Sequence, residues 1–329
     1  MTLLLSDSEV RALCDIGLMT GYLDQALRKE AKGGGAEIPE RLNLAHGSVF
    51  LRVMPALLPE SGLLGLKFFH GSMNDGVRYV VAVCSLETGA ILGLIDAAYL
   101  TAARTGATSG VATRWLSRED SATAAVIGSG LEAETNLRAV CSVRQVTRAA
   151  VYSRNPQRRE AFAARMTTAL GIPVTAAADP QTAVAGTDIV IIATNTGPDP
   201  VVAYHGAWAE PGQHIVSIGS TTPALREIDT DTILNADTVV LDAPLAQMST
   251  ESGDIIAALA ARPGWNTAIP LAHIITGENP GRRHPTDITL FKSVGTAAQD
   301  LLAATHLLRQ ARQHGIGTEL PDIANPKQF

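Results

Sequence analysis

From Ala122 onward, short apolar segments alternate with longer amphipathic stretches. An apolar run of about four to six residues bounded by turn residues predicts a buried strand. Alternation of such strands with helices is typical of a parallel sheet with right-handed crossovers. The expected strands lie at 124–127, 149–152, 174, 189–193, 214–218 and 238–241. This part of the chain is therefore predicted to be a doubly wound α/β domain.

The first third of the chain has a different pattern. Polar residues 6–9 predict the start of a helix that runs to about Gly17, and a second helix is expected at 23–32. Strand-like runs follow, separated by turns rich in Gly, Asn and Asp, and these predict a mostly antiparallel sheet. The runs lie at 49–54, 64–69, 77–84 and 90–95, and a long helix is expected at 97–116.

A last amphipathic helix, at 294–314, is expected to cross back and pack on this first region. A chain of 329 residues is long enough to bury two separate cores. We therefore expect an α+β domain formed by 1–115 and completed by the C-terminal helix in 300–329. The Rossmann domain, with its doubly wound parallel sheet, is expected at 116–299.

The segment ATAAVIGSGLEA, from Ala122 to Ala133, joins a predicted strand to a predicted helix. Its small residues Gly128, Gly130 and Ala133 have the GxGxxA spacing of dinucleotide-binding loops. The first glycine permits a tight turn, the second lets the backbone approach a pyrophosphate, and the third small residue lets helix and strand pack closely. The N–H groups at the start of the helix are donors to the phosphate. The alternative is an ordinary strand-to-helix turn, but the flanking pattern favours a nucleotide loop.

The residues after the second strand of this unit indicate which dinucleotide binds. An NAD site usually has Asp or Glu there to accept from the ribose 2′-hydroxyl. This chain has Ser153, Arg154 and Asn155, with no carboxylate before Glu160. Hydroxyl and guanidinium donors suit a 2′-phosphate, so NADPH is expected rather than NADH. Arg154 is the better candidate, because Arg159 fits equally well on the solvated face of the next helix.

Composition excludes several classes of protein. Hydrophobic residues make up 46% of the chain and charged residues 18%, as in globular proteins. The net charge of −6 gives no electrostatic reason to expect a nucleic acid or membrane partner. The three cysteines are far apart and the eight histidines lack ligand spacing, so neither a disulfide framework nor a metal site is expected. With no signal peptide and no apolar run near the ~20 residues of a membrane span, we expect a cytoplasmic protein.

Several cations of the first region stand out because their surroundings are apolar or small. Lys67 lies in an otherwise apolar strand, where a lysine either extends outward at an edge or is a functional cation with a charged partner. Arg104 is the sole charge in a run of small residues that permits close approach of another backbone or of a ligand. His70 lies three residues after Lys67. It either reaches the substrate pocket beside Lys67 or is simply solvated.

Five segments of this chain have an order and spacing that resemble the ornithine cyclodeaminase/mu-crystallin family. They are 66–67, 86–89, 104–107, 128–130 and 291–295, and the likeness extends from about Arg41 to Gly317. The resemblance implies an N-terminal substrate-binding domain that forms a homodimer, followed by a Rossmann domain. It also implies chemistry at the Cα–N bond of an α-amino acid with bound NAD(P).

The resemblance assigns roles to individual residues. Arg41, Lys67 and Arg104 match the clamp for the substrate carboxylate, which holds Cα against the nicotinamide. Lys67 also matches the residue that assists proton movement and is the expected catalytic residue, while Arg52 and Val294 are expected to line the substrate pocket. The expected cofactor residues are Arg104, Gly128, Gly130, Leu131, Glu132 (usually Gln in the family), Ala133, Ser153, Arg154, Asn155, Thr194, Ser217, Gly219, Ser220 and Ser293.

Two departures from the family pattern indicate the branch. Thr221 stands where cyclodeaminases have Asp, and a threonine is no general base near neutral pH. Arg52 stands where they have Glu, and a cation there repels the distal ammonium of ornithine while suiting a neutral or acidic side chain.

The sequence therefore favours an NADPH-dependent reductase of an imine or 2-oxo acid, or the reverse dehydrogenase, acting on a small-molecule amino or imino acid. The leading substrate is a cyclic ketimine such as pyrroline-2-carboxylate. Three alternatives stay open: an ornithine or lysine cyclodeaminase that recycles NAD, an alanine or opine-like amino acid dehydrogenase, and a non-catalytic ligand-binding protein.

Overall fold

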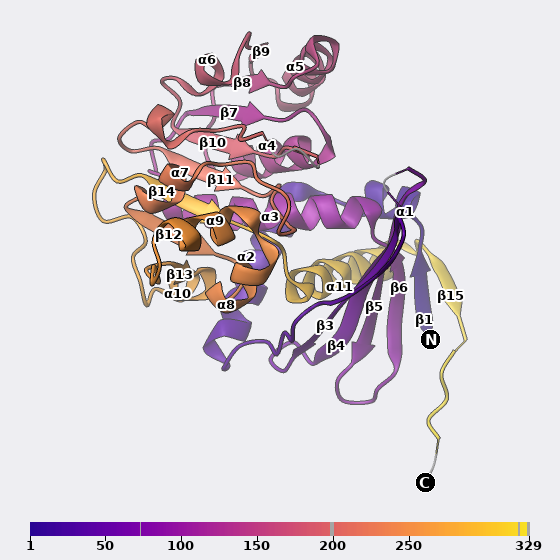
Figure 1. Cartoon of the computed structure of the whole chain (residues 1–329). Helices are drawn as coiled ribbons and strands as arrows, with labels where there is room; N and C mark the ends of the chain where they lie inside the picture. Colours follow the sequence, from indigo (N-terminus) through magenta and orange to yellow (C-terminus); the bar gives the residue numbers. More distant parts are fainter. Residues whose placement is uncertain (73, 198–200, 322, 328–329) are drawn as a thin grey trace. The chain divides into compact units, whose positions relative to one another are not determined.

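The computed structural model describes residues 1–72, 74–197, 201–321 and 323–327. Contacts between Cα atoms divide the chain into two compact units, Met1–Arg104 with Thr296–Phe329, and Thr105–Gly295 (Figure 1). The chain first passes from one unit to the other after Arg104, which lies inside helix α3 (Ala98–Leu116). The sequence pattern instead predicts a boundary at the end of that helix. The domain boundaries themselves stay a prediction. No helix within the described ranges is long and apolar enough to cross a membrane.

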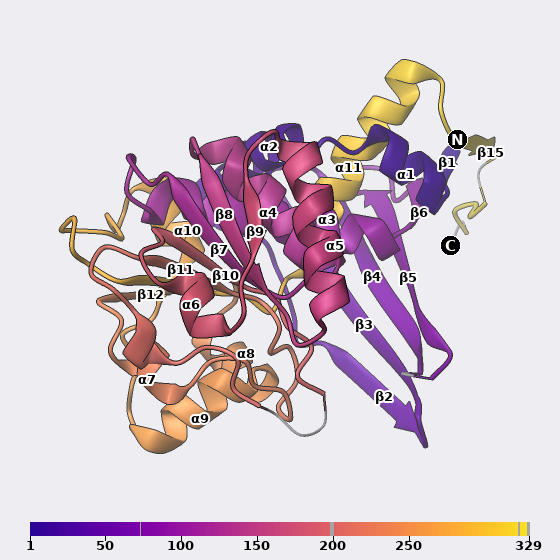
Figure 2. The same cartoon turned by 90° about the horizontal axis from the view of Figure 1, so that it is seen from above.

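The first unit is built on one sheet, with strand order β15-β1-β6-β5-β4-β3-β2. Strands β2 to β6 pair antiparallel, as the turn pattern predicts, and β1 joins β6 in parallel. Figure 2 shows β2 at the edge of this sheet. The elements are β1 (Thr2–Leu5), α1 (Asp7–Leu13), α2 (Ile16–Lys32), β2 (Leu42–His46), β3 (Val49–Leu58), β4 (Leu63–Ser72), β5 (Gly76–Ser85), β6 (Ile91–Asp96), the start of α3, α11 (Ala297–His314) and β15 (Thr318–Leu320).

Three expectations for this unit were wrong in detail. Helix α2 begins at Ile16, well before the predicted start, because Asp15 caps it by accepting from the N–H of Leu18 at 2.8 Å. Helix α11 begins at Ala297, after Gly295 with its positive φ of 74°. The strands β1, β2 and β15 were missed. Each is short, and its extended conformation depends on pairing with a neighbouring strand rather than on its own residues.

Helix α11 returns to the first unit, as the fold class requires, and lies against β3, β4 and β5 (Figure 1). Two glycines let it approach the sheet. A Cβ at Gly65 would lie 3.0 Å from Leu301, and a Cβ at Gly93 would lie 2.5 Å from Leu308. Close helix–sheet packing places the first turn of α11 directly over β4.

The second unit is a parallel sheet with strand order β13-β12-β14-β11-β10-β7-β8-β9, so the predicted doubly wound fold is confirmed. Strand β14 was missed because it ends in Lys292, a charge that interrupts the apolar pattern. The elements are β7 (Thr123–Ile127), α4 (Leu131–Val143), β8 (Arg148–Tyr152), α5 (Pro156–Leu170), β9 (Val174–Ala176), α6 (Pro180–Val184), β10 (Ile189–Ile192), η1 (Gly206–Trp208), β11 (His214–Ser217), α7 (Thr230–Leu234), β12 (Thr238–Leu241), α8 (Leu245–Glu251), α9 (Gly253–Ala261), β13 (Ile269–Pro270), α10 (Leu271–Thr276) and β14 (Thr289–Lys292).

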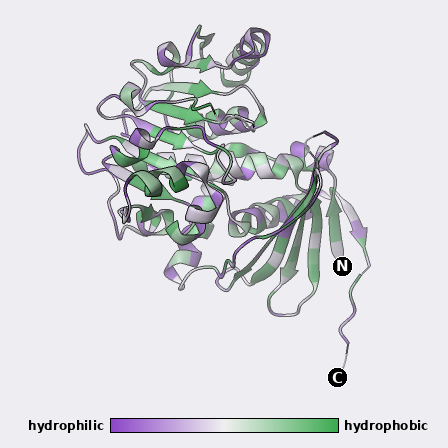
Figure 3. Ribbon diagram, in the orientation of Figure 1, coloured by the Kyte–Doolittle hydropathy of each residue, from purple (hydrophilic) through white to green (hydrophobic). Residues whose placement is uncertain are grey.

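Alternate residues of these strands point to opposite faces and form two cores. Val126 and Ile191 pack with helices α4 and α5, whereas Ile127 and Ile192 pack with α7, α8 and α9. Both faces of the sheet are therefore covered, which explains why its strands appear in Figure 3 mostly in the green of hydrophobic residues.

The turn from β7 to α4 has the geometry that its glycines predict. Gly128 has φ +128°, and a Cβ there would lie 2.2 Å from the carbonyl oxygen of Ala193. Gly130 is the N-cap of α4, and a Cβ there would meet no heavy atom within 4 Å. The two glycines therefore serve different needs, since Gly128 is required by the protein itself whereas Gly130 keeps space open.

This difference predicts the stability of two alanine variants. Gly128→Ala forces a strained backbone and a clash, and we expect it to lower the free energy of unfolding by about 3 kcal/mol. Gly130→Ala meets no such obstacle, and we expect a change below about 1 kcal/mol. Urea denaturation of both variants measures this, and equal losses of stability would contradict the assignment.

Candidate functional site

The expected cofactor residues of the second unit gather at the carboxyl ends of its parallel strands. The loop of Gly128 and Gly130 follows β7, Ser153 follows β8, and Thr194 comes after β10. Strand β11 ends in Ser217, with Gly219 and Ser220 beyond it, and Ser293 follows β14. Strands β7 and β10 are neighbours, but the chain leaves them toward opposite edges of the sheet. Such a switch point is where open α/β sheets bind ligands.

The residues of the glycine loop fit a dinucleotide. Ala133 is fully buried beneath Gly128, so α4 starts close to the strand. Leu131 and Glu132 form the first turn of α4, where backbone N–H groups have no partner within the helix. Because the space beside Gly130 is open, a phosphate group can approach these N–H groups.

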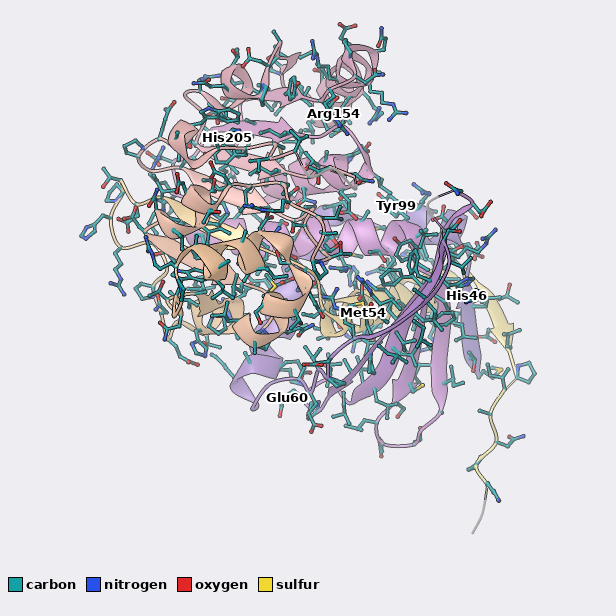
Figure 4. The ribbon with its side chains drawn as sticks, viewed as in Figure 1. His46, Met54, Glu60, Tyr99, Arg154 and His205 are labelled. Carbon is teal, nitrogen blue, oxygen red and sulfur yellow. The ribbon has the colours of Figure 1, made fainter. Side chains whose placement is uncertain are left out.

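The neighbouring residues offer donors rather than a carboxylate. The Ser129 hydroxyl donates to Ser153 Oγ at 2.9 Å, which joins the glycine loop to the end of β8. Arg154 is exposed, and its Nη2 donates to the carbonyl oxygen of Asn195 at 3.3 Å; Figure 4 labels it beside α5. Arg159 is half-buried, lies over the ring of Tyr152 at 5.6 Å and donates from Nη1 to the carbonyl oxygen of Ser153 at 3.3 Å, so it does not lie simply on the solvated face of α5.

Asn155, one of the expected cofactor residues, caps a helix in the structure. Its side chain accepts from the N–H of Arg158 at 2.9 Å and so caps α5. This cap fixes the backbone of the segment that carries Ser153 and Arg154.

A buried acid that the sequence analysis missed holds two of these strand ends together, those of β10 and β11. Glu227 accepts from Ser217 Oγ at 2.7 Å and from the N–H of Gly219 at 2.6 Å. Its other oxygen accepts from the hydroxyl of Thr194 at 2.9 Å. One carboxylate therefore sets the positions of three predicted cofactor residues, and it acts as a positioning group.

The charge of Glu227 is compensated within the same core. Lys292, fully buried at the end of β14, lies 3.6 Å from Glu227 and 3.2 Å from Asp254, and it donates to Ser217 Oγ at 2.9 Å. Burial raises the pKa of Glu227 above its usual range, while the nearby Lys292 ammonium opposes that shift. Removing Lys292 would take away the cation that compensates the buried Glu227, whereas Lys292 would keep Asp254 if Glu227 were removed.

A second missed acid, Asp242, holds the turn after β14. Its carboxylate accepts from the hydroxyl of Ser293 at 2.6 Å and from the N–H groups of Val294 and Gly295 at 3.0 and 2.9 Å. The Val294 side chain packs into the core of this unit. Its expected role in the substrate pocket stays a prediction.

The first unit holds a separate cluster of charges. Lys67, on β4, is 2% exposed, and Arg104, on α3, is 4% exposed. Between them lies the fully buried carboxylate of Asp300, on α11, at 2.8 Å from Lys67 Nζ and 2.7 Å from Arg104 Nε. Gln299 accepts from Arg104 Nη1 at 3.0 Å. The structure thus favours a functional cation over an edge residue at Lys67.

This environment brings the pKa of Lys67 close to neutral pH. Burial lowers the pKa of Lys67 from its usual value to about 8, with the charges of Arg104 and Arg41 adding to the decrease and Asp300 opposing it. Lys67 is therefore mostly protonated at neutral pH but close enough to its pKa to release a proton.

The remaining candidates of the first unit differ in position. Arg52 pairs with Phe69 across β3 and β4, and its guanidinium lies 5.4 Å from the centre of that ring. It shares the Lys67 face of the sheet with Met54, which Figure 4 labels and which pairs with Lys67. His70 is an odd number of residues from Lys67 on one strand, so it faces the other side, where it stacks on Phe68. His70 is thus no part of the Lys67 cluster.

The chain is similar to known proteins along nearly its whole length. The model of the ornithine cyclodeaminase/mu-crystallin family matches residues 1–315. A Delta(1)-pyrroline-2-carboxylate reductase of Bacillus cereus is 31% identical over 97% of this chain and 99% of its own length.

Two solved structures are also similar. The Thermococcus litoralis Delta(1)-pyrroline-2-carboxylate reductase, in complex with NADH and L-proline, has a TM-score of 0.89 at 34% identity and covers 97% of this chain and 100% of its own. An archaeal alanine dehydrogenase dimer with bound NAD has a TM-score of 0.87 at 28% identity, covering 97% and 99%. This chain belongs to the ornithine cyclodeaminase/mu-crystallin family.

Proposed function

We propose that this protein is a nicotinamide-dependent reductase that converts a cyclic ketimine, such as pyrroline-2-carboxylate, into an α-amino acid. The observation that carries the proposal is the buried pair of cations, Lys67 and Arg104, around one compensating acid. The reductases to which the chain is similar act on such a ketimine by name, and the Thermococcus litoralis enzyme was solved with NADH and L-proline.

Different residues of the chain have different roles in the proposed reaction. Arg41, Lys67 and Arg104 bind the carboxylate of the substrate, which fixes the orientation of its Cα. The loop of Gly128 and Gly130 would hold the nicotinamide cofactor, which when bound in its reduced form would supply the hydride for that carbon. Lys67, with a pKa of about 8, donates a proton to the substrate nitrogen, so that C=N becomes CH–NH and the charges balance. Lys67 then regains its proton from solvent.

The branch-specific residues support a reductase over a cyclodeaminase. Thr221 offers no carboxylate to assist the loss of ammonia. Arg52, on the same sheet face as Lys67, would repel the ammonium of ornithine. The substrate side chain is therefore neutral, as in a closed ring, or acidic.

For the cofactor, the finer proposal is NADPH. The supporting observation is that Ser153 and Arg154 stand at the end of β8 without an adjacent carboxylate. We further propose a homodimer that works in the cytoplasm, where a reducing environment suits the free cysteines Cys14, Cys84 and Cys141. The edge strand β2 supports the dimer, since all its residues are exposed, including Leu42 and Leu44.

The reaction is tested by following the absorbance of NADPH with pyrroline-2-carboxylate. We expect net oxidation by the wild type, and a loss of about 100-fold or more in kcat/KM for Lys67→Met, because that variant lacks both the proton and one charge of the clamp. Fluorescence titration of NADPH is the control and should be unchanged. Ammonia release from ornithine without net NADPH consumption would instead identify a cyclodeaminase, and NADPH binding without any turnover a binding protein.

The cofactor choice is tested with Arg154→Ala. Loss of a charge-assisted contact to a 2′-phosphate should weaken NADPH binding about 10- to 100-fold and leave NADH binding unchanged. Arg158→Ala, also exposed and on the same segment, is the matched control and should change neither. Gly130→Ala should weaken both cofactors alike, since a Cβ there fills the space beside the helix N-terminus. Equal weakening of both cofactors by Arg154→Ala would rule out the assignment.

The dimer is tested by measuring the molar mass of the protein by light scattering as it elutes from a gel-filtration column. The wild type should have the mass of two chains, and Leu42→Asp with Leu44→Asp should give one chain, because two buried charges oppose association. Leu18→Asp, at a residue of α2 that is 64% exposed, should leave the dimer intact. A double variant that keeps the dimeric mass would exclude β2 as the contact.

A further inference from the structure

Asp300 has a position that the proposed reaction does not explain. Its two carboxylate oxygens face different cations, Oδ1 toward Arg104 Nε at 2.7 Å and Oδ2 toward Lys67 Nζ at 2.8 Å. The three residues come from three elements, α11, α3 and β4. All three are nearly or fully buried, so these ion pairs are little screened by solvent.

The arrangement controls geometry as well as charge. Arg104 is held at Nε by Asp300 and at Nη1 by Gln299, the preceding residue of the same helix. Acceptors at two different nitrogens fix the plane of a guanidinium group. The Lys67 ammonium, on a flexible stem, is tied to the same carboxylate, so one acid determines the spacing of the two cations.

The charge balance points to an anion as the ligand. Two cations and one carboxylate leave a net positive charge among these three residues, Arg41 adds to it, and a buried net charge is costly unless another ion compensates it. A substrate carboxylate reduces that net charge. Without Asp300 the same pair would carry two positive charges and would lose one by releasing a proton from Lys67.

We propose that Asp300 is a positioning residue that holds Lys67 and Arg104 at the spacing bridged by one substrate carboxylate, and that it keeps Lys67 protonated for the reaction. The inference deepens the proposed function and rests on it. The described charged groups that act on Lys67 are Asp300 from α11, Arg104 from α3 and Arg41, which precedes β2. Asp300 is the one acid among them, so it alone favours the ammonium form.

The sign of the pH dependence follows from these charges. In the wild type the Lys67 ammonium is present below pH 8 or so and is lost as the pH rises through that value. Without Asp300, burial and two arginines act unopposed, so the pKa of Lys67 falls further. Removal of one adjacent charge moves a pKa by about one to three units.

The test measures binding of pyrrole-2-carboxylate, a flat monoanion without a reducible C=N bond, by calorimetry between acidic and alkaline pH. For the wild type we expect affinity to fall above a midpoint near pH 8. Asp300→Asn should move that midpoint down by about one to three pH units. Asp300→Glu keeps the charge but is one methylene longer, so it should keep the midpoint and weaken binding at least tenfold.

The matched control is Gln299→Met, which removes a neutral acceptor of Arg104 from the adjacent position. It should weaken binding without moving the midpoint, because it changes no charge. A purely structural role for Asp300 would lower the melting temperature of Asp300→Asn and leave the midpoint where it is in the wild type. That result would overturn the proposal.

The outcomes also separate this inference from the proposed function. A wild type that binds pyrrole-2-carboxylate with the expected midpoint but reduces no ketimine would refute the reductase and leave the role of Asp300 supported. Failure of the wild type to bind the probe at any pH would refute both the clamp and its positioning by Asp300. If Asp300→Asn does not fold, Asp300→Glu decides, since wild-type affinity in that variant would contradict the claim about spacing.

Discussion

Lys67 and Arg104 can be buried side by side only because a third charge, on Asp300, lies between them. An isolated cation in a protein interior would lose its proton or draw in water, and two adjacent cations would repel each other as well. This requirement explains why the last helix returns to the first unit. Asp300 reaches β4 because α11 packs against the sheet at Gly65, so the path of the chain and the chemistry of Lys67 depend on the same contact.

In the second unit, too, a buried carboxylate is paired with a buried cation. Glu227 collects donors from the ends of β10 and β11, and Lys292 compensates its charge from β14. Parallel strands bring these residues to the edge of the sheet at which open α/β folds bind their ligands. Because each donor is already engaged, the loop containing Gly219 is held in place before any cofactor arrives. Such preorganisation lowers the entropy lost on binding.

The sequence predicted the fold class, the family and the reaction class, and the comparisons confirm all three. Period-two and helical patterns identified most strands and the nucleotide loop because those depend on local residues. Asp300 and Glu227 could not be found in this way, since their roles arise from partners far away in the chain. Glu227 does lie in the Arg226-Glu227 pair beside the expected nicotinamide segment, so a buried acid there was a usable signal. Strand β14 was missed for a related reason, because the charge that ends it is compensated only in the folded state.

The state of the acids also limits which reaction the chain can perform. Loss of ammonia requires a carboxylate that is available to accept a proton, whereas delivery of a hydride to an imine requires a proton donor. Asp300 and Glu227 are each bonded to a buried cation, so neither is available as a base without first breaking an ion pair. Lys67, by contrast, has a pKa of about 8, which lies close to neutral pH. Its ammonium is an acid, and with Thr221 in place of an aspartate the balance of charges in this chain favours reduction over elimination.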